Sequence, residues 1–182
     1  MTRVIFLDRD GVINKYPGDY LYVDSVDKFK FLPGSKEAIV QLYKAGYILF
    51  VISNQAGVTK GIYSQKALDE ITEVMIKGIQ GEGGQIQKVL YCIHTDKENC
   101  GCRKPKAGSL FMATKDMGEI DKLNSFFIGD SLRDVKAGKS FGCKTILVLT
   151  GRQKLADKDS WDVEPDFIAE DLTKAVELVL KK

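Results

Sequence analysis

The 182-residue sequence has no long hydrophobic run and no excess of charge of either sign. No apolar stretch approaches the roughly 18 residues that a membrane-spanning helix requires, so no membrane partner is expected. The 27 basic residues face 25 acidic ones without forming a cluster, which argues against nucleic acid as a partner. The start of the chain, Met1 to Arg3, leads directly into a short apolar strand and does not resemble a signal peptide. We therefore predict a cytoplasmic protein.

Cysteine and histidine are scarce, with four residues and one residue respectively. At this length a single domain (1–182) is the default, and it can bury roughly 70% of its unfolded surface without disulfide staples. Three of the cysteines and the only histidine nevertheless share one short segment: Cys92, His94, Cys100 and Cys102. In a reducing compartment such a cluster indicates a metal site rather than disulfides.

Apolar β-rich runs alternate with stretches of helical periodicity along the whole chain. The predicted strands cover residues 4–7, 47–52, 87–93, 126–128, 145–149 and 167–168. The predicted helices cover residues 35–44, 64–79, 109–117, 132–140 and 172–180. Continuous apolar strands separated by helices predict a parallel sheet covered by helices on both faces, a three-layer α/β/α fold of the Rossmann type.

Polar side chains follow the first four predicted strands. In an open α/β sheet the carboxyl ends of the strands form the ligand-binding edge. The residues at these ends are Asp8 and Asp10 after the first strand, Ser53, Asn54 and Gln55 after the second, Arg103 and Lys104 beyond the third, and Asp130 and Asp134 after the fourth. We therefore expect carboxylates, a hydroxyl group and a lysine to converge at one edge.

This set of residues is suited to phosphate-ester hydrolysis. Asp8 and Asp130 are oxygen ligands for a hard cation such as Mg²⁺, which commonly also binds substrate phosphate oxygens. Lys104 and Ser53 would supply a positive charge and a hydroxyl donor to that phosphate. Asp8 is placed to attack phosphorus, and Asp10 to protonate the leaving oxygen and then deprotonate the attacking water.

Four motifs in order make the sequence resemble the haloacid dehalogenase (HAD) type phosphatases over nearly its whole length. They are Phe6 to Asn14, Ile52 to Gln55, Arg103 to Pro105, and Ile128 to Asp134. Within this superfamily the chain is similar to the branch that holds histidinol-phosphate phosphatases and heptose bisphosphate phosphatases. The resemblance implies a Mg²⁺-dependent enzyme with an aspartyl-phosphate intermediate.

The resemblance also implies roles for single residues. Asp8 would be the nucleophile and Asp10 the acid/base, with Mg²⁺ held by Asp8, the backbone carbonyl of Asp10, and Asp130. Ser53, Asn54, Gln55, Arg103 and Lys104 would bind the phosphoryl group or the substrate, and Asp134 would orient neighbouring groups rather than bind the metal. Many relatives insert a cap domain. The 20 or so residues between Asn14 and Ser35 leave no room for one.

The Cys92–His94 and Cys100–Cys102 pairs supply three thiolates and one imidazole. That is a complete tetrahedral Zn²⁺ set with no open position, so a structural zinc is expected. Arg103 and Lys104 follow the last ligand directly, and the metal would fix the loop that presents them. With the histidine so used, the acid/base work must fall to a carboxylate.

Two substrates fit the pattern. The five-residue gap between His94 and Cys100 resembles the histidinol-phosphate phosphatase loop, whereas residues 54–64 and 103–108 resemble the heptose bisphosphate branch. We favour removal of the C7 phosphate of D-glycero-D-manno-heptose 1,7-bisphosphate, since Lys60, Arg103 and Lys106 offer cations for a second phosphate.

Two functions of another class stay open, a phospho-receiver signalling domain and a DNA-end-binding module. A receiver needs an aspartate after the third strand and a lysine after the fifth, and the sequence has neither at those positions. A nucleic-acid module would bring a basic stripe with interleaved aromatic residues, which is also missing. No exposed apolar helix face stands out, so a monomer acting on a small phosphate ester is expected.

Overall fold

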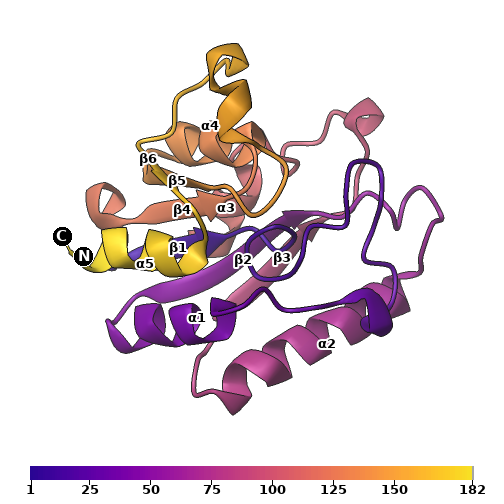
Figure 1. Ribbon diagram of the computed structural model, residues 1–182, viewed down its shortest axis with the longest axis horizontal. Coiled ribbons are helices and arrows are strands. Elements are labelled where there is room, and N and C mark those ends of the chain that lie inside the picture. The colour runs from indigo at the N-terminus through magenta and orange to yellow at the C-terminus, as the bar shows by residue number, and fades with distance from the viewer. Residues whose placement is uncertain (182) are drawn as a thin grey trace.

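The computed structural model describes residues 1–181, and six parallel strands form its central sheet (Figure 1). The strands run in the spatial order β3-β2-β1-β4-β5-β6. Their bounds are β1 Val4–Leu7, β2 Ile48–Asn54, β3 Lys88–Cys92, β4 Phe126–Gly129, β5 Lys144–Val148 and β6 Phe167–Ala169. Each lies within two residues of its predicted position, because buried parallel strands appear in a sequence as continuous apolar runs.

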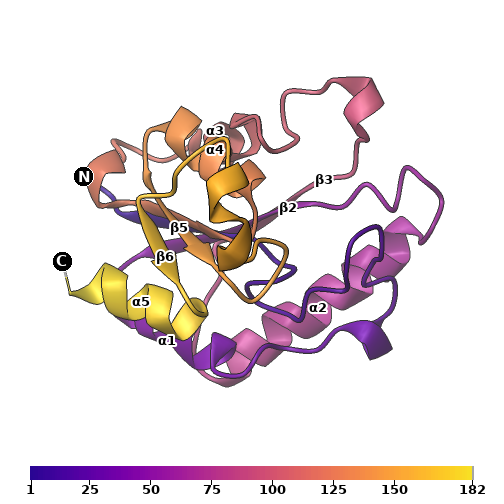
Figure 2. The same ribbon diagram turned by 45° about the horizontal axis from the view of Figure 1, so that its top comes forward.

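Five helices cover the sheet: α1 Ser35–Lys44, α2 Gln65–Gly81, α3 Gly108–Thr114, α4 Leu132–Phe141 and α5 Leu172–Leu180. Helices α1, α2 and α5 lie on one face, and α3 and α4 lie on the other (Figures 1 and 2). The predicted three-layer α/β/α fold is therefore confirmed. Between residues 15 and 34 the chain forms a loop with one short 3-10 turn, Val26–Lys28, and no cap domain is inserted there.

Strand β1 lies at the centre of the core and divides it into two halves. Ile5 and Leu7 pack towards α1, α2 and α5, whereas Val4 and Phe6 pack towards α3 and α4. This alternation follows from the two-residue period of a strand. All four side chains are fully buried, so β1 ends in a rigid setting that fixes the residues after Leu7.

The ends of α2 show where local sequence is informative. Ser64 is the N-cap of this helix, because its side chain accepts a hydrogen bond from the backbone N–H of Ala67 at 3.1 Å. The buried face of the helix consists of Leu68, Ile71, Met75 and Ile79, whereas Val74 is exposed.

The strand order positions the functional edge. All strands are parallel, but the order in which the chain adds them to the sheet reverses at β1. Strands β2 and β3 lie on one side of β1, and β4, β5 and β6 lie on the other. Ligands of open α/β sheets bind at such a switch point, outside the carboxyl ends of the strands. Asp8 and Asp130 follow these two strands directly. No helix within residues 1–181 is long and apolar enough to cross a membrane.

Candidate active site

Three aspartates gather at the switch point between β1 and β4. Asp8, Asp130 and Asp134 each offer a carboxylate oxygen, and these oxygens lie within 4.8 Å of one another. All three side chains are buried. Asp8 is fixed by its backbone, whose N–H donates to Ile128 O at 3.0 Å, as if continuing the β1–β4 ladder. The sequence prediction that the first and fourth strands place carboxylates together holds in the structure.

Among residues 1–181, the ammonium group that pairs with this cluster is that of Lys104. Its Nζ lies 2.8 Å from Asp8 Oδ2 and 2.5 Å from Asp134 Oδ1, and it donates to Ile52 O at 2.9 Å. Three buried carboxylates facing one buried lysine leave an excess of negative charge when all are ionised. Such a site is stabilised by a divalent cation or by protonation.

Burial and charge crowding perturb the acid strength of the cluster. Burial, opposed by Lys104 and reinforced by Asp134, raises the pKa of Asp8 to about 6. Burial and the neighbouring Asp8 carboxylate raise the pKa of Asp130 well above its usual range. The aspartates raise the pKa of Lys104, although burial alone would lower it. The lysine therefore stays charged while the carboxylates compete for protons or for a metal.

Backbone close approach shapes the surroundings of Asp130. Its Oδ2 accepts the backbone N–H of Arg152 at 2.7 Å. Gly11, at φ +81°, and Gly151 lie so near the carboxylate that a Cβ atom at either position would collide with it. The backbone at Gly11 and at Gly151 therefore restricts the Asp130 carboxylate to one orientation in the site.

Asp134 uses both carboxylate oxygens within the protein. Oδ2 accepts from the backbone N–H of Ser131 at 3.0 Å and from its hydroxyl at 2.7 Å, which closes a capping box at the start of α4. Oδ1 pairs with Lys104. This arrangement suits an orienting role rather than direct metal binding.

The three polar residues at the end of β2 have different partners. Ser53 is buried beside the cleft and accepts a hydrogen bond from Gln55 Nε2 at 3.1 Å. Asn54 exchanges two hydrogen bonds with the backbone of Lys104, at 3.0 and 3.1 Å, and so fixes the lysine. Gln55 donates to Asp10 Oδ2 at 2.9 Å.

Asp10 is paired with Arg9, a residue to which the sequence analysis gave no role. The guanidinium of Arg9 is fully buried, and its Nη2 lies 3.0 Å from Asp10 Oδ2 and 3.1 Å from Oδ1. Asn14 Nδ2 donates to the same Oδ1 at 2.9 Å. Nothing in the local sequence indicates this burial, since an arginine between two aspartates would be expected in solvent.

A cleft of about 220 Å³ opens above these groups. The loop from Tyr16 to Tyr22 forms one side of the cleft, and the segment with Asp96 and Arg103 forms another. Besides Arg103 and Lys104, three further cations line the cleft: Lys60, Arg133 and Arg152.

The positions of Arg133 and Arg152 in the cleft are not predicted from the sequence, for different reasons. Arg152 follows β5, and extending the strand-end rule to the fifth strand would have found it. Its side chain donates to Asp19 Oδ1 at 2.9 and 2.6 Å. Arg133 lies in the first turn of α4, where no periodicity distinguishes a cleft-facing side chain. Within residues 1–181 Arg133 forms no ion pair with a carboxylate.

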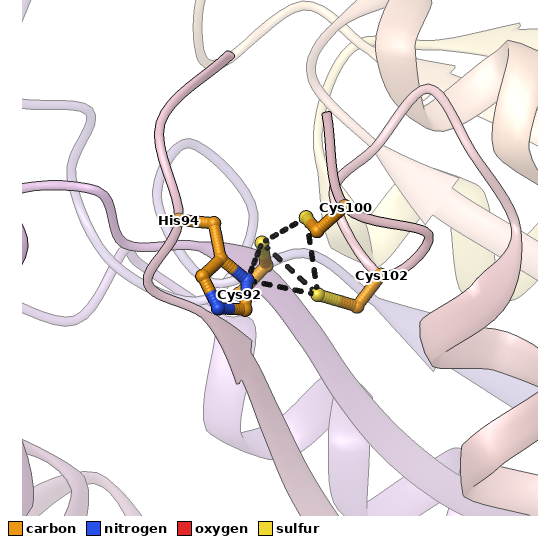
Figure 3. Close-up of side chains that lie close together, drawn as sticks. All are labelled: Cys92, His94, Cys100 and Cys102. Atoms are coloured by element: carbon orange, nitrogen blue, oxygen red, sulfur yellow. Dashed lines mark hydrogen bonds between the residues drawn. The ribbon is translucent and has the colours of Figure 1, made fainter. Parts of the chain in front are cut away.

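The cysteines and the histidine form a second cluster, beyond the end of β3 (Figure 3). The Sγ of Cys102 lies 3.3 Å from those of Cys92 and Cys100 and 3.3 Å from His94 Nδ1. Zinc–sulfur bonds of about 2.3 Å in a tetrahedron would set sulfur atoms roughly 3.8 Å apart. The four side chains therefore already surround a point at which one small tetrahedral ion fits.

The cluster is tied to the cleft by Arg103. Its Nε donates to Asp96 Oδ1 at 2.7 Å and its Nη1 to His94 O at 3.1 Å. The expectation that Lys106 serves a second phosphate fails: Lys106 does not line the cleft. Its Nζ instead donates to the carbonyls of Asn99 and Cys100, at 2.9 and 3.0 Å, and so supports the loop.

The geometry also bears on the receiver alternative. Strand β3 is the edge strand of the sheet and ends at Cys92, in the cysteine cluster rather than at a phosphorylatable aspartate. After β5, Thr150 donates to Gly11 O at 2.6 Å. The positions that a receiver needs are thus occupied by other structural elements.

Comparisons with known proteins agree with this geometry. A family model described as HAD-hydrolase-like matches residues 101–175. The D-glycero-beta-D-manno-heptose-1,7-bisphosphate 7-phosphatase of Pasteurella multocida is 39% identical over 84% of both chains. The D-glycero-alpha-D-manno-heptose-1,7-bisphosphate 7-phosphatase of Campylobacter jejuni is 37% identical over 86% of this chain and 87% of its own.

A solved structure extends the likeness over the full chain. The D,D-heptose 1,7-bisphosphate phosphatase of B. bronchiseptica, complexed with magnesium and phosphate, superimposes with a TM-score of 0.90 at 31% identity. The alignment covers 99% of each chain. The strand order, the carboxylate cluster at the switch point and this degree of identity lead to one conclusion: the chain belongs to the HAD-like hydrolase family.

Proposed function

We propose that the protein is a magnesium-dependent phosphatase that removes the C7 phosphate of D-glycero-D-manno-heptose 1,7-bisphosphate. The observation that carries the chemistry is the buried cluster of three aspartates beside Lys104, whose excess negative charge a divalent cation would balance when the carboxylates are ionised. The B. bronchiseptica relative, solved with magnesium and phosphate, supports the same metal and the same ligand.

The donor set fits Mg²⁺ because it consists of oxygen atoms only. Asp8, Asp130 and the backbone carbonyl of Asp10 would hold the ion. When bound, the ion would neutralise carboxylate and phosphate oxygens and favour attack on phosphorus. Asp134 would hold Lys104 and the start of α4 in place, since both of its oxygens are already engaged.

The reaction would proceed in two displacements. A carboxylate oxygen of Asp8 attacks phosphorus, the P–O bond to the sugar breaks, and Asp10 gives its proton to the sugar oxygen. Water then attacks the phosphorus of the aspartyl phosphate, Asp10 takes a proton from that water, and the Asp8–phosphorus bond breaks to release phosphate. Lys104 and Ser53 would stabilise the phosphoryl oxygens in both steps.

The cation-lined cleft supports a bisphosphate as substrate. Lys60, Arg103, Arg133 and Arg152 lie around the cleft, in addition to Lys104. A second phosphate on a small sugar would meet one or more of these side chains, whereas the uncharged end of a monophosphate would not. The similarity to heptose bisphosphate phosphatases also favours this substrate over histidinol phosphate.

The cysteine and histidine cluster would hold Zn²⁺ with a structural role. Its three sulfur atoms and one nitrogen atom leave no position for a water molecule, and Arg103 connects the loop to the cleft. Zinc would therefore keep Arg103 and Lys104 in the positions that the substrate needs.

A comparison of substrates tests the proposed function. Phosphate release is measured with the 1,7-bisphosphate, with heptose 7-phosphate and with histidinol phosphate, in magnesium and after chelation. We expect the largest kcat/KM for the bisphosphate, no activity after chelation, and a C1 monophosphate as the product. Equal kcat/KM values for the three esters would contradict the substrate assignment. Both anomers are included, because the similar relatives are named for both.

A further inference from the structure

Arg9 is an unusual feature of the site because its charge lies where neither substrate nor solvent can reach it. The side chain is fully buried, it does not line the cleft, and its Nη1 has no hydrogen-bond partner within residues 1–181. Burying a guanidinium is costly unless a carboxylate pairs with it. Its carboxylate partner in the described chain is Asp10, which does line the cleft.

The pairing fixes both oxygens of Asp10. Arg9 donates from Nε to Oδ1 at 3.2 Å and from Nη2 to both oxygens. Asn14 adds a donor to Oδ1, and Gln55 adds one to Oδ2. A planar fork on a planar carboxylate restricts rotation about the last side-chain bond more than a single contact does.

Gln55 is itself oriented by two donors. Its Oε1 accepts the hydroxyl of Tyr63 at 2.6 Å and Nη2 of Arg9 at 3.2 Å. A flipped amide would turn its NH₂ group towards these donors, so the observed orientation alone satisfies the network. The Nε2 group is thereby directed at Asp10. The Tyr63 ring is set close against Gly57, where a Cβ atom would collide with it.

We propose that Arg9, with Gln55 and Tyr63 behind it, is a positioning residue that aims the Asp10 carboxylate at the ester oxygen of the leaving group. Arg9 acts through Asp10 and touches no substrate atom. Its contribution therefore belongs to the steps in which Asp10 moves a proton. In kcat/KM, which reports the first displacement, esters that need a proton on the leaving oxygen depend on Arg9, and esters with a stable leaving anion do not. The later attack of water, in which Asp10 takes a proton whatever the ester, is common to both and affects kcat.

The experiment compares two ester types in the full-length, metal-loaded protein. The alkyl ester is the 1,7-bisphosphate, whose sugar alkoxide must be protonated as it leaves. The aryl ester is 4-nitrophenyl phosphate, whose phenolate leaves without a proton. For Arg9→Met we expect kcat/KM to fall about 100-fold on the alkyl ester, in the range of general acid catalysis, and by less than about threefold on the aryl ester. Equal losses on both esters would overturn the proposal.

A double-mutant cycle tests the route through Asp10. In the Asp10→Asn background, Arg9→Met should cause little further loss, because its target carboxylate is already gone. Additive losses would contradict the positioning role. Tyr63→Phe removes a single hydroxyl group and tests the same network if Arg9→Met does not fold. It should reduce kcat/KM severalfold on the alkyl ester and leave the aryl ester unchanged, and a uniform loss would again count against the proposal.

The inference rests on the proposed phosphatase activity, and the two can fail separately. Absence of hydrolysis of both esters by the unmodified protein would contradict the proposed function. Hydrolysis of both esters, with losses that do not depend on the leaving group in the variants, would contradict the role of Arg9 alone.

Discussion

The carboxylate cluster and the cysteine cluster are both groups of candidate metal ligands near strand ends, yet they differ in chemistry and in access. Asp8 and Asp130 offer oxygen ligands that line the cleft, and Asp134 lies behind them, where Lys104 pairs with it and with Asp8. Cys92 and its partners offer sulfur and nitrogen in a complete tetrahedral set outside the cleft. Oxygen ligands leave room for water and phosphate, whereas four soft ligands close a site. The fold thus places an open set of oxygen ligands at the cleft and a closed set of sulfur and nitrogen ligands outside it.

The largest difference between the clusters should appear on removing one ligand from the carboxylate side. Asp8→Asn is nearly isosteric and removes the attacking oxygen, so we expect kcat to fall more than about 1,000-fold. The fold should be kept, because the change also relieves crowding with Asp130 and Asp134. Phosphate release and thermal unfolding measure the two effects.

A surface aspartate serves as the control for that variant. The side chain of Asp116 is exposed and makes only a long contact with Lys115, so Asp116→Asn should leave both turnover and the melting temperature unchanged. Near-normal turnover in Asp8→Asn would exclude Asp8 as the nucleophile.

Removing a ligand from the cysteine cluster should give the opposite balance of effects. Cys102→Ser should lower the zinc content and the melting temperature, and reduce kcat/KM about 10- to 100-fold through disorder of Arg103. Cys143→Ala is a matched control, because Cys143 is buried outside the cluster. Elemental analysis, unfolding and kinetics report the three effects. Full zinc content in Cys102→Ser would contradict the ligand assignment.

How far the sequence predicts this site depends on whether a signal is local. Apolar runs predicted the strands, and the strand-end rule then brought Asp8, Asp130 and Lys104 to one edge, as the structure shows. The spacing of the cysteines predicted their cluster in the same way, since all four ligands come from one short segment.

Side-chain direction was not predictable in the same way. Arg9 is fully buried, and one of its partners, Gln55, lies 46 residues away in the sequence and accepts a hydrogen bond from its Nη2. Lys106 lies near the cleft in sequence but extends to the carbonyls of Asn99 and Cys100. Both outcomes depend on contacts between loops, and periodicity contains no information on these.

The cations that line the cleft should show a smaller effect, which depends on the substrate. Arg133 lines the cleft and forms no ion pair with a carboxylate in the described chain, so it is free to meet a phosphate. Arg133→Met should raise KM for the 1,7-bisphosphate about tenfold while leaving heptose 7-phosphate within twofold. Lys136, which is also positively charged, pairs with Asp162 away from the cleft and gives a control as Lys136→Met. Equal changes for both substrates would exclude Arg133 as a contact of the second phosphate.

The smallest expected effect is on the melting temperature, and its dependence on pH distinguishes the carboxylate cluster from the cysteine cluster. Folding raises the pKa of Asp8 from 3.8 to about 6, mainly through burial. Above about pH 6, Asp8 is therefore ionised in the folded state as well as in the unfolded chain. The ionised carboxylate is better solvated in the unfolded chain, so its burial lowers the stability of the fold. The stabilising contribution of the protonated group is complete below about pH 4 and is lost as the pH rises through about 6. In metal-free protein, Asp8→Asn should thus gain a few degrees in melting temperature over the unmodified chain at pH 7, and this gain should shrink steadily as the pH falls towards 4. Magnesium should remove this difference in melting temperature by stabilising the unmodified chain, because it binds the ionised carboxylate.

The melting temperature of Cys102→Ser relative to the unmodified chain should show no such dependence on magnesium. A pH-independent difference between Asp8→Asn and the unmodified chain would mean that Asp8 is not the group whose charge the metal balances.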